Sequence, residues 1–402
     1  MFSYTCVVLL KYAKTRKASP FVYSRNRKIF RRALEAVEKY NRQRRIPRCS
    51  LLSVSRSPWH RVFMSGDNQA MITLTGFDIP SFNYLANLFA PVYERYTPFM
   101  DANGYIIPKI STTRGRPRMM DPADCLGLVL AWSRTRGSLM VLQLIFGMTM
   151  SPVSKYLQFA RRILVKILKA NPLAKIKLPS VVKLEEYRDM IADRHPALDM
   201  VWGTMDGLKC QIEKAPDEIV QSRFYNGWKS DHFVSAVLCF VPDGTIVSAF
   251  FNVPGCCHDS TIADWGDIYL KLERVYEETG LMFVIDSAFA SGTFKFLIKS
   301  SQDDLTADDQ LLDVTDQVQN IAVKRAATSM RQSAEWGMRA VQSSFPRLKD
   351  RMVYEEHGER RIIFTCLFHL YNLRARLVGI NQIANVYLPA LDFDANVQFV
   401  NV

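Results

Sequence analysis

The chain has 402 residues, of which 48% are apolar and 23% charged, and its formal net charge is +13. This balance is typical of a globular protein and excludes a chain that is disordered throughout. It has no run of 18 or more apolar residues, so we expect no membrane span. Its eight cysteines form no C-x-x-C pair, so we expect reduced thiols in an intracellular protein. The first ten residues lack the basic leader and the cleavage site of a secretory signal.

Positive charge is concentrated in the first part of the chain. Residues 1–50 carry 14 basic against 2 acidic residues (+12), and residues 101–170 carry 11 against 3 (+8). Residues 171–402 carry 24 basic against 31 acidic residues (−7). A segregated basic half suits a polyanion, above all nucleic acid. For the partly disordered segment 1–50, a solvated tail without a specific partner explains the charge equally well. Its basic clusters also suggest nuclear import, and hence a nuclear protein.

Residues 51–171 are expected to be mainly helical. Residues 51–110 form a poorly defined region with one helix, Phe82–Tyr93. In residues 111–171, Asp121 is a suitable N-cap for a helix over Pro122–Trp132. A short helix (138–146), a turn containing Gly147 and a long helix (151–168) then resemble a helix-turn-helix. Spacing alone leaves a simple α-hairpin packed on the core as the alternative.

Two groups of basic residues in this region are candidate DNA contacts. Arg114, Arg116 and Arg118 lie in an extended Arg-Gly-Arg-Pro-Arg stretch, which is narrow enough for an A·T-rich minor groove. The alternative is a basic linker before a helix. Lys155, Arg161, Arg162 and Lys166, on the second helix of the motif, are placed to meet phosphates.

Residues 181–385 have the pattern of an α/β domain. A Pro/Lys-rich connector (172–180) precedes them, and residues 386–402 form a C-terminal tail. The expected elements, in chain order, are a helix (184–193), a strand (199–207), a hairpin (232–241 and 245–251), a helix (259–278), a buried strand (281–285), an acidic loop (300–320) and a helix with an apolar stripe at Ala334, Met338, Val341 and Phe345. The loop has six Asp and no Lys or Arg.

Three acidic residues of this domain are candidate catalytic groups. Asp206 lies on the first strand, Asp286 ends the buried strand, and Glu335 lies on the last helix. If the two strands are neighbours, their carboxylates converge at one edge of the sheet, and the helix can bring Glu335 over them. Such oxygen ligands suit Mg²⁺ or Mn²⁺, and a pair of these ions can clamp both oxygens of a phosphodiester displacement. Ordinary capping and surface roles remain the alternative.

Five ordered motifs add to this pattern. They are Thr204-Met-Asp206-Gly207, the segment 224–229 (Phe-Tyr-Asn-Gly-Trp-Lys), the segment 252–260 (Asn-Val-Pro-Gly-Cys-Cys-His-Asp-Ser), the segment 285–289 (Ile-Asp-Ser-Ala-Phe) and Arg331-Gln-Ser-Ala-Glu335. Over about residues 110–385 the chain resembles the DDE endonuclease domain of Harbinger-type (PIF/Harbinger) transposases and their domesticated relatives. We interpret Asp259, in the third motif, as the cap of the following helix. Ile285 and Phe289 depart from the Gly and Tyr that are usual in the family.

The resemblance implies an RNase H-like core, a mixed sheet flanked by helices, behind the helix-turn-helix-like region. It also implies two divalent metal ions, Mg²⁺ or Mn²⁺, held by Asp206, Asp286 and Glu335. The expected activity is cutting of phosphodiester bonds at transposon ends and joining of the freed 3′-hydroxyl to target DNA. A Myb-like accessory DNA-binding protein is an implied partner, and a homo-oligomer is expected.

Two other functions remain open from the sequence. The basic first half could belong to a transposase-derived protein that binds DNA but no longer cuts it; salt-dependent binding without cleavage would identify it. A two-metal hydrolase acting on RNA or RNA–DNA hybrids is the third possibility, and a comparison of duplex and hybrid substrates would separate it.

Overall fold

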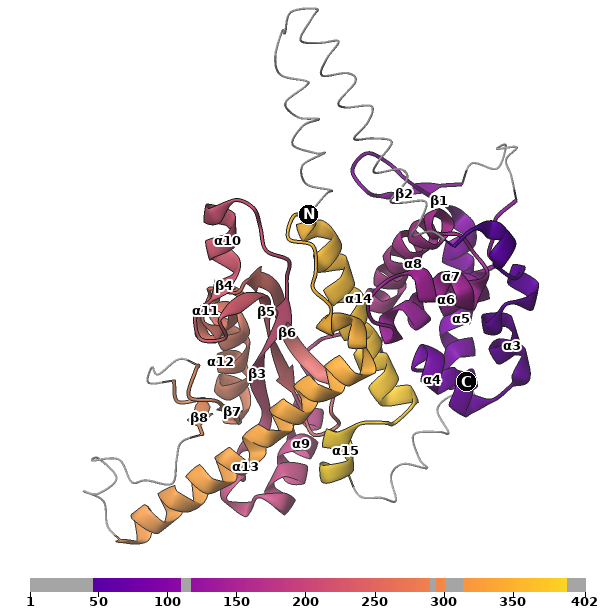
Figure 1. Ribbon diagram of the computed structural model, residues 1–402. Helices are drawn as coiled ribbons and strands as arrows, with labels where there is room; N and C mark the ends of the chain where they lie inside the picture. Colours follow the sequence, from indigo (N-terminus) through magenta and orange to yellow (C-terminus); the bar gives the residue numbers. More distant parts are fainter. Residues whose placement is uncertain (1–45, 110–116, 290–293, 301–313, 389–402) are drawn as a thin grey trace, which may run out of the picture. The chain divides into compact units, whose positions relative to one another are not determined.

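The computed structural model describes residues 46–109, 117–289, 294–300 and 314–388 (Figure 1). Arg114 and Arg116 lie outside these residues, as does most of the predicted acidic loop. The chain divides into two compact units, residues 1–60 with 138–154, and residues 61–137 with 155–402. This division differs from the domain boundaries expected from the sequence, which remain predictions.

The described part of the first unit is built around two aromatic rings. Trp59 stacks on Phe146 with 5.3 Å between ring centroids. Gly147 ends α7 in the left-handed conformation, with φ 62°, and a Cβ atom there would lie 2.4 Å from the carbonyl oxygen of Leu52. The turn therefore requires glycine. The elements of this unit are η1 (Arg48–Ser50), η2 (Val54–Arg56) and α7 (Met140–Phe146), while α3 (Pro58–Ser65) and α8 (Met150–Ala170) run from one unit into the other.

The second unit begins with a helical region in which capping is unambiguous. Asp78 and Asp121 accept hydrogen bonds from Ser81 N (2.9 Å) and Asp124 N (2.7 Å), so they start their helices as N-caps. The predicted cap at Asp121 is thereby confirmed. The elements here are α4 (Asn68–Thr75), α5 (Ile79–Arg95), β1 (Tyr96–Met100), β2 (Ile106–Pro108), α6 (Pro122–Arg134) and most of α8. Residues 51–109 thus contain several helices and a two-stranded sheet, where we expected a poorly defined region with one helix.

The rest of the second unit is an α/β domain. Its strands are β3 (Val201–Gln211), β4 (Tyr225–Asn226), β5 (Asp231–Phe240), β6 (Ile246–Pro254), β7 (Met282–Ile285) and β8 (Leu297–Lys299). Its helices are α9 (Val181–Arg194), η3 (Pro196–Leu198), α10 (Glu218–Phe224), α11 (Asp259–Trp265), α12 (Ile268–Thr279), α13 (Val314–Ser344), η5 (Pro346–Lys349), α14 (His357–Leu377) and α15 (Gln382–Tyr387). No helix in the described part of the chain combines the length and apolar character needed to cross a bilayer.

The sheet is mixed, which confirms the predicted fold class at this level. The strand order is β4-β5-β3-β7-β8, and β6 also pairs with β5. The β3–β5 and β5–β6 pairs are antiparallel, whereas β3–β7 and β7–β8 are parallel. The predicted hairpin is therefore present as β5 and β6. Because β3 and β7 are parallel neighbours, their carboxyl ends point toward the same edge of the sheet.

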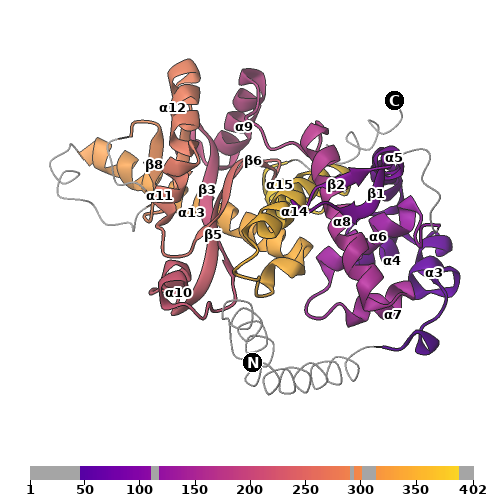
Figure 2. The same ribbon diagram turned by 90° about the horizontal axis from the view of Figure 1, so that it is seen from above.

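Helices cover both faces of this sheet (Figures 1 and 2). On one face, Trp202, Val237 and Phe283 belong to a buried cluster with Ile262 of α11 and Leu272 of α12. On the other face lie α13 and α14, where the ring of Phe240 meets that of Tyr371 edge-on at 6.4 Å. The core of the domain therefore consists of two apolar layers, one on each face of the sheet.

Three features of the domain differ from the sequence prediction. The single helix expected over residues 259–278 is two helices, because Gly266 packs onto Phe250 and Asp267 adopts a left-handed conformation with φ 52°. The acidic segment is helical from Val314 onward, with Asp316 favourably placed in the first turn of α13. Helix α14, which the pattern analysis did not identify, is buried along most of its length.

Candidate functional site

Asp206 and Asp286 are brought together by strand register. In the parallel β3–β7 pair, Thr204 lies opposite Val284. Asp206 follows two residues after Thr204, and Asp286 follows two residues after Val284, immediately beyond the end of β7. Asp206 and Asp286 thus lie at the same level on, or directly after, neighbouring strands of the sheet.

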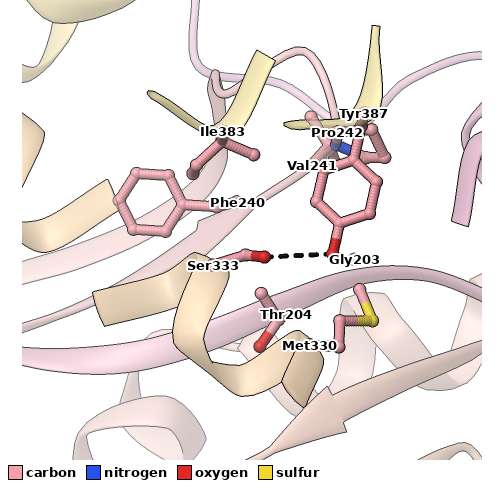
Figure 3. A pocket seen from close by; sticks show the side chains of 9 residues that line it. All are labelled: Gly203, Thr204, Phe240, Val241, Pro242, Met330, Ser333, Ile383 and Tyr387. Atoms are coloured by element: carbon pink, nitrogen blue, oxygen red, sulfur yellow. Dashed lines mark hydrogen bonds between the residues drawn. The ribbon is translucent and has the colours of Figure 1, made fainter. Parts of the chain in front are cut away.

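The side chain of Asp206 points toward α13. Thr204, Met330 and Ser333 line a common cavity of about 10 Å³, room for no more than one water molecule (Figure 3). Thr204 therefore lies on the α13 face of β3. Since alternate residues of a strand share a face, Asp206 faces α13 as well. The hydroxyl groups of Ser333 and Tyr387, which also line this cavity, lie 3.0 Å apart.

Glu335 is linked to Asp286 by an arginine. On α13, Arg331 Nη2 lies 3.0 Å from Glu335 Oε1, and its Nη1 lies 3.8 Å from Asp286 Oδ2. Arg339 Nη2 lies 3.8 Å from the other oxygen of Glu335. The guanidinium of Arg331 thus spans the helix and the strand end. Two of the three predicted carboxylates, Asp286 and Glu335, therefore pair with this cation.

The electrostatics of Asp206 reflect the same neighbourhood. Burial raises the pKa of this carboxyl from 3.8 to about 6, although the hydrogen bond from Gly207 N (2.7 Å) works against the rise. The negative charge of Asp286 raises the pKa further, and the charge of Arg331 lowers it. Asp206 is thus within electrostatic reach of both Asp286 and Arg331.

Asp259 lies on the other side of β3 and is not a helix cap. The N-cap of α11 is His258, whose side chain makes no capping bond, and Asp259 is the first helical residue. Its carboxylate packs against Gly207, where a Cβ atom would lie 2.3 Å from Oδ2. Its Oδ1 is buried without a hydrogen-bond partner, and Lys209 Nζ lies 3.9 Å from Oδ2. The predicted capping role is therefore wrong, because the side chain turns toward the strand instead of the helix amides.

The donor chemistry of the three predicted residues fits a hard divalent cation. Asp206, Asp286 and Glu335 offer only carboxylate oxygens, which Mg²⁺ and Mn²⁺ prefer, and a guanidinium stands in as the cation among them. Across the described ranges, however, no three His, Cys, Asp or Glu side chains are grouped closely enough to hold a metal ion. Oxygens of Asp286 and Glu335 pair with Arg331 instead.

Two of the sequence motifs are joined to each other by hydrogen bonds. Asn226 Nδ2 donates to Gly255 O at 2.9 Å, and Cys256 N donates to Arg223 O at 3.2 Å. Gly255 packs so closely against the backbone of Phe233 that a Cβ atom at residue 255 would lie 2.5 Å from Phe233 O. The segment 224–229 is thus hydrogen-bonded to the loop that precedes α11. A positioning role accounts for Asn226 and Gly255 in these motifs.

The described basic residues predicted to contact DNA are partly used inside the fold. Arg118 donates to Tyr93 O (2.8 Å) and Tyr96 O (2.6 Å), and its guanidinium lies 4.3 Å from the centre of the Tyr93 ring. Lys155 is exposed and lies over the ring of Phe99 at 5.3 Å. Lys166 Nζ bonds to Tyr96 Oη. Of this group, Lys155 and Lys166 remain exposed to solvent.

Arg161 and Arg162 both pair with a single, partly buried acid. Arg161 Nη2 donates to Glu359 Oε2 at 3.0 Å, and Arg162 Nη2 bonds to Glu359 Oε1. Arg161 also stacks on Trp132, 4.8 Å from the ring centre. Burial alone would raise the pKa of Glu359, but its bonds to Arg162 and Arg161 hold it below the ordinary value. These contacts join α8 to α14, which weighs against phosphate contacts by the same two arginines.

Comparison with known families agrees with this site. Residues 205–372 match the family model of the DDE superfamily endonucleases. The matched range contains Asp206, Asp286 and Glu335, and it supports a transposase-derived DDE endonuclease of the nuclease type. No match was found among curated proteins or among solved structures.

Sequence interpretation missed the role of Arg331 and the true position of Asp259. Arg331 stands four residues before Glu335, and this spacing alone predicts an ion pair on one helix face. The contact of Arg331 with Asp286 depends on the tertiary structure. The closeness of Asp259 to Gly207 likewise depends on the packing of α11 against β3, for which the sequence offers only the glycine as a signal.

Proposed function

We propose that this protein is a DDE-type, metal-dependent DNA endonuclease of the Harbinger type, a transposase that cuts transposon ends and joins them to target DNA. One observation carries the proposal: parallel strand register places Asp206 beside Asp286, and Arg331 ties Asp286 to Glu335 from α13. The mixed sheet with helices on both faces supports an RNase H-like core. The family match over residues 205–372 supports the nuclease class.

In this proposal Asp206, Asp286 and Glu335 hold two Mg²⁺ or Mn²⁺ ions. When bound, such ions neutralise charge at the phosphate and lower the pKa of the attacking water or 3′-hydroxyl. Asp206 and Asp286 lie on or directly after central strands, so the sheet fixes their backbone positions. Because the pKa of Asp206 is about 6, this carboxyl is mostly ionised above pH 7 and available as a ligand. No covalent protein nucleophile is needed.

The proposed reaction has two steps. In the first, a water oxygen forms a bond to the phosphorus at the transposon end, the bond to the 3′-oxygen breaks, and a 3′-hydroxyl is released. In the second, that 3′-oxygen bonds to a phosphorus of the target strand and displaces the target's own 3′-oxygen. The attacking group loses a proton and the leaving oxygen gains one in each step.

DNA cleavage tests the proposal directly. The substrate is a supercoiled plasmid that carries the genomic DNA from both sides of the coding sequence, incubated with Mn²⁺ or Mg²⁺. We expect nicking by the natural protein and none by Asp206→Asn. Equal activity of the two proteins would reject the assignment. Salt-dependent binding without cleavage under any divalent ion would identify the DNA-binding alternative instead.

The partners and location follow from the same proposal. We expect both transposon ends and the target to be bound by a homo-oligomer, which light scattering with and without DNA would reveal. A Myb-like DNA-binding protein is the proposed accessory partner, testable by co-purification. We also propose that the protein is nuclear and that residues 1–50 direct import; their deletion should leave a fluorescent fusion outside the nucleus.

A further inference from the structure

Arg331 occupies a central place among the three carboxylates. It contacts Glu335 on its own helix at 3.0 Å and Asp286 on the neighbouring strand end at 3.8 Å. About 28% of its side chain is exposed, and Asp286 and Glu335 are similarly shielded at 29% and 33%. Its charge also reaches Asp206. The guanidinium is therefore the counter-ion of Asp286 and Glu335.

The contacts of Arg331 use oxygens that a metal ion would need. Mg²⁺ binds carboxylate oxygens at about 2.0–2.1 Å and demands a nearly octahedral arrangement. A guanidinium at 3.0 Å from Glu335 Oε1 engages lone pairs of the same oxygen, and it adds a positive charge that repels the cation. The ion and the guanidinium therefore compete for Glu335 and Asp286.

We propose that Arg331 is a displaceable counter-ion: it holds Asp286 and Glu335 in a closed arrangement, which a hard divalent cation opens by displacing the guanidinium. The inference rests on the proposed function and names a positioning residue within that site. Arg331 thereby weakens cation binding, and it prevents the three carboxylates from repelling one another while no cation is bound.

Arg339 provides a matched control on the same helix. It also stands four residues from Glu335, with Nη2 3.8 Å from Oε2, but 76% of its side chain is exposed. No ion pair connects it to Asp286 in the described structure. If any positive charge near Glu335 weakens cation binding, replacing either arginine should change the affinity for the cation. If the guanidinium must be displaced from the site, only the replacement of Arg331 should change it.

The experiment is a Mn²⁺ titration of the full chain at pH 8, with free Mn²⁺ measured by electron paramagnetic resonance. The proteins are the natural chain, Arg331→Met, Arg331→Lys, Arg339→Met and Asp206→Asn. We expect Arg331→Met to bind Mn²⁺ about tenfold more tightly, since a positive charge near the ion is removed. The Mn²⁺ affinity of Arg331→Lys should lie between those of the natural chain and Arg331→Met. Arg339→Met should change the affinity by less than about twofold, because the charge of Arg339 is screened by solvent.

Thermal unfolding gives a second readout that does not depend on activity. In EDTA, Arg331→Met should unfold at a lower temperature than the natural chain, because its carboxylates repel one another. Saturating Mn²⁺ should raise its unfolding temperature by more than that of the natural chain, since a tighter ligand stabilises more. If Arg331→Met does not fold, Arg331→Lys still tests the order of affinities.

The outcomes separate the inference from the proposed function. Mn²⁺ binding that disappears in Asp206→Asn but is unchanged or weaker in Arg331→Met overturns the inference and leaves the nuclease proposal standing. If Arg331→Met binds Mn²⁺ and the natural chain does not, the inference is supported, because the guanidinium then blocks the site completely. Absence of binding by the natural chain and by both Arg331 variants overturns both proposals.

Discussion

Arg161 Nη2 donates to Glu359 Oε2 at 3.0 Å, and this contact joins α8 to α14 within the second unit. Glu359 also accepts from Arg162, so one carboxylate serves two guanidinium groups. Breaking a buried ion pair by removing one partner leaves the other charge without compensation. We expect Glu359→Gln to lower the free energy of unfolding by about 2 kcal/mol, allowing for partial solvent screening. Urea unfolding followed by circular dichroism measures the loss.

An exposed pair on α9 is the control for this substitution. Lys183 Nζ lies 2.6 Å from Glu186 Oε2, but both side chains are more than 40% exposed. Glu186→Gln should change the free energy of unfolding by less than about 0.5 kcal/mol. The depressed pKa of Glu359 also predicts that the free energy of unfolding depends on pH. The stabilisation by Glu359 is present above its unfolded-state pKa and is lost as pH falls through its folded-state pKa. Equal losses in both variants would contradict a special role for Glu359.

Asp206 should make stability depend on pH in the opposite sense. Its folded-state pKa of about 6 exceeds the ordinary value of 3.8, so the folded protein binds this proton more tightly than the unfolded chain does. This contribution is fully present below about pH 4 and is lost as pH rises through 6. Asp206→Asn should therefore unfold a few degrees higher than the natural chain at pH 8 in EDTA, reflecting about 3 kcal/mol.

The same titration predicts the pH dependence of metal binding. A proton and a cation compete for the Asp206 carboxylate, so Mn²⁺ affinity should rise as pH increases through about 6 and level off above pH 7. Scanning calorimetry at pH 5 and pH 8 tests the stability claim, and Mn²⁺ titrations over the same range test the binding claim. An Asp206→Asn variant that is less stable than the natural chain at pH 8 would contradict the raised pKa.

Much of the second unit is predictable from local sequence pattern. Asp121 followed by Pro122 identifies the start of α6, and the uninterrupted apolar run before Asp286 identifies a strand buried on both faces. The site is less predictable, since Arg331 meets Asp286 only through the packing of α13 on the sheet. Asp259 occupies a sequence position suited to a cap, but the absence of a side chain at Gly207 lets its carboxylate turn to the strand. These features depend on tertiary contacts that periodicity does not encode.

Gly255 should be intolerant of any side chain. A Cβ atom there would lie 2.5 Å from Phe233 O and 2.8 Å from Phe224 O, and both are backbone atoms that cannot rotate away. Gly255→Ala should therefore lower the free energy of unfolding by about 1–3 kcal/mol, as overpacked sites do. Gly227 is the control, because no atom lies within 4 Å of a Cβ placed there. If Gly227→Ala and Gly255→Ala destabilise equally in urea unfolding, the close approach at Gly255 is not the cause.

Gly207 and Asp259 should be coupled in a double-mutant cycle. A Cβ atom at residue 207 would lie 2.3 Å from Oδ2 and 2.5 Å from Cγ of Asp259, so Gly207→Ala must push this carboxylate away from β3. Because Oδ1 of Asp259 is buried, the displaced group has little room to move. We expect Gly207→Ala alone to cost about 1–3 kcal/mol. In an Asp259→Ala background the obstructing atoms are gone, and the same substitution should cost much less, with a coupling energy of about 1–2 kcal/mol. Urea unfolding of the four proteins measures that energy, and strictly additive effects would show that the two residues do not meet in solution.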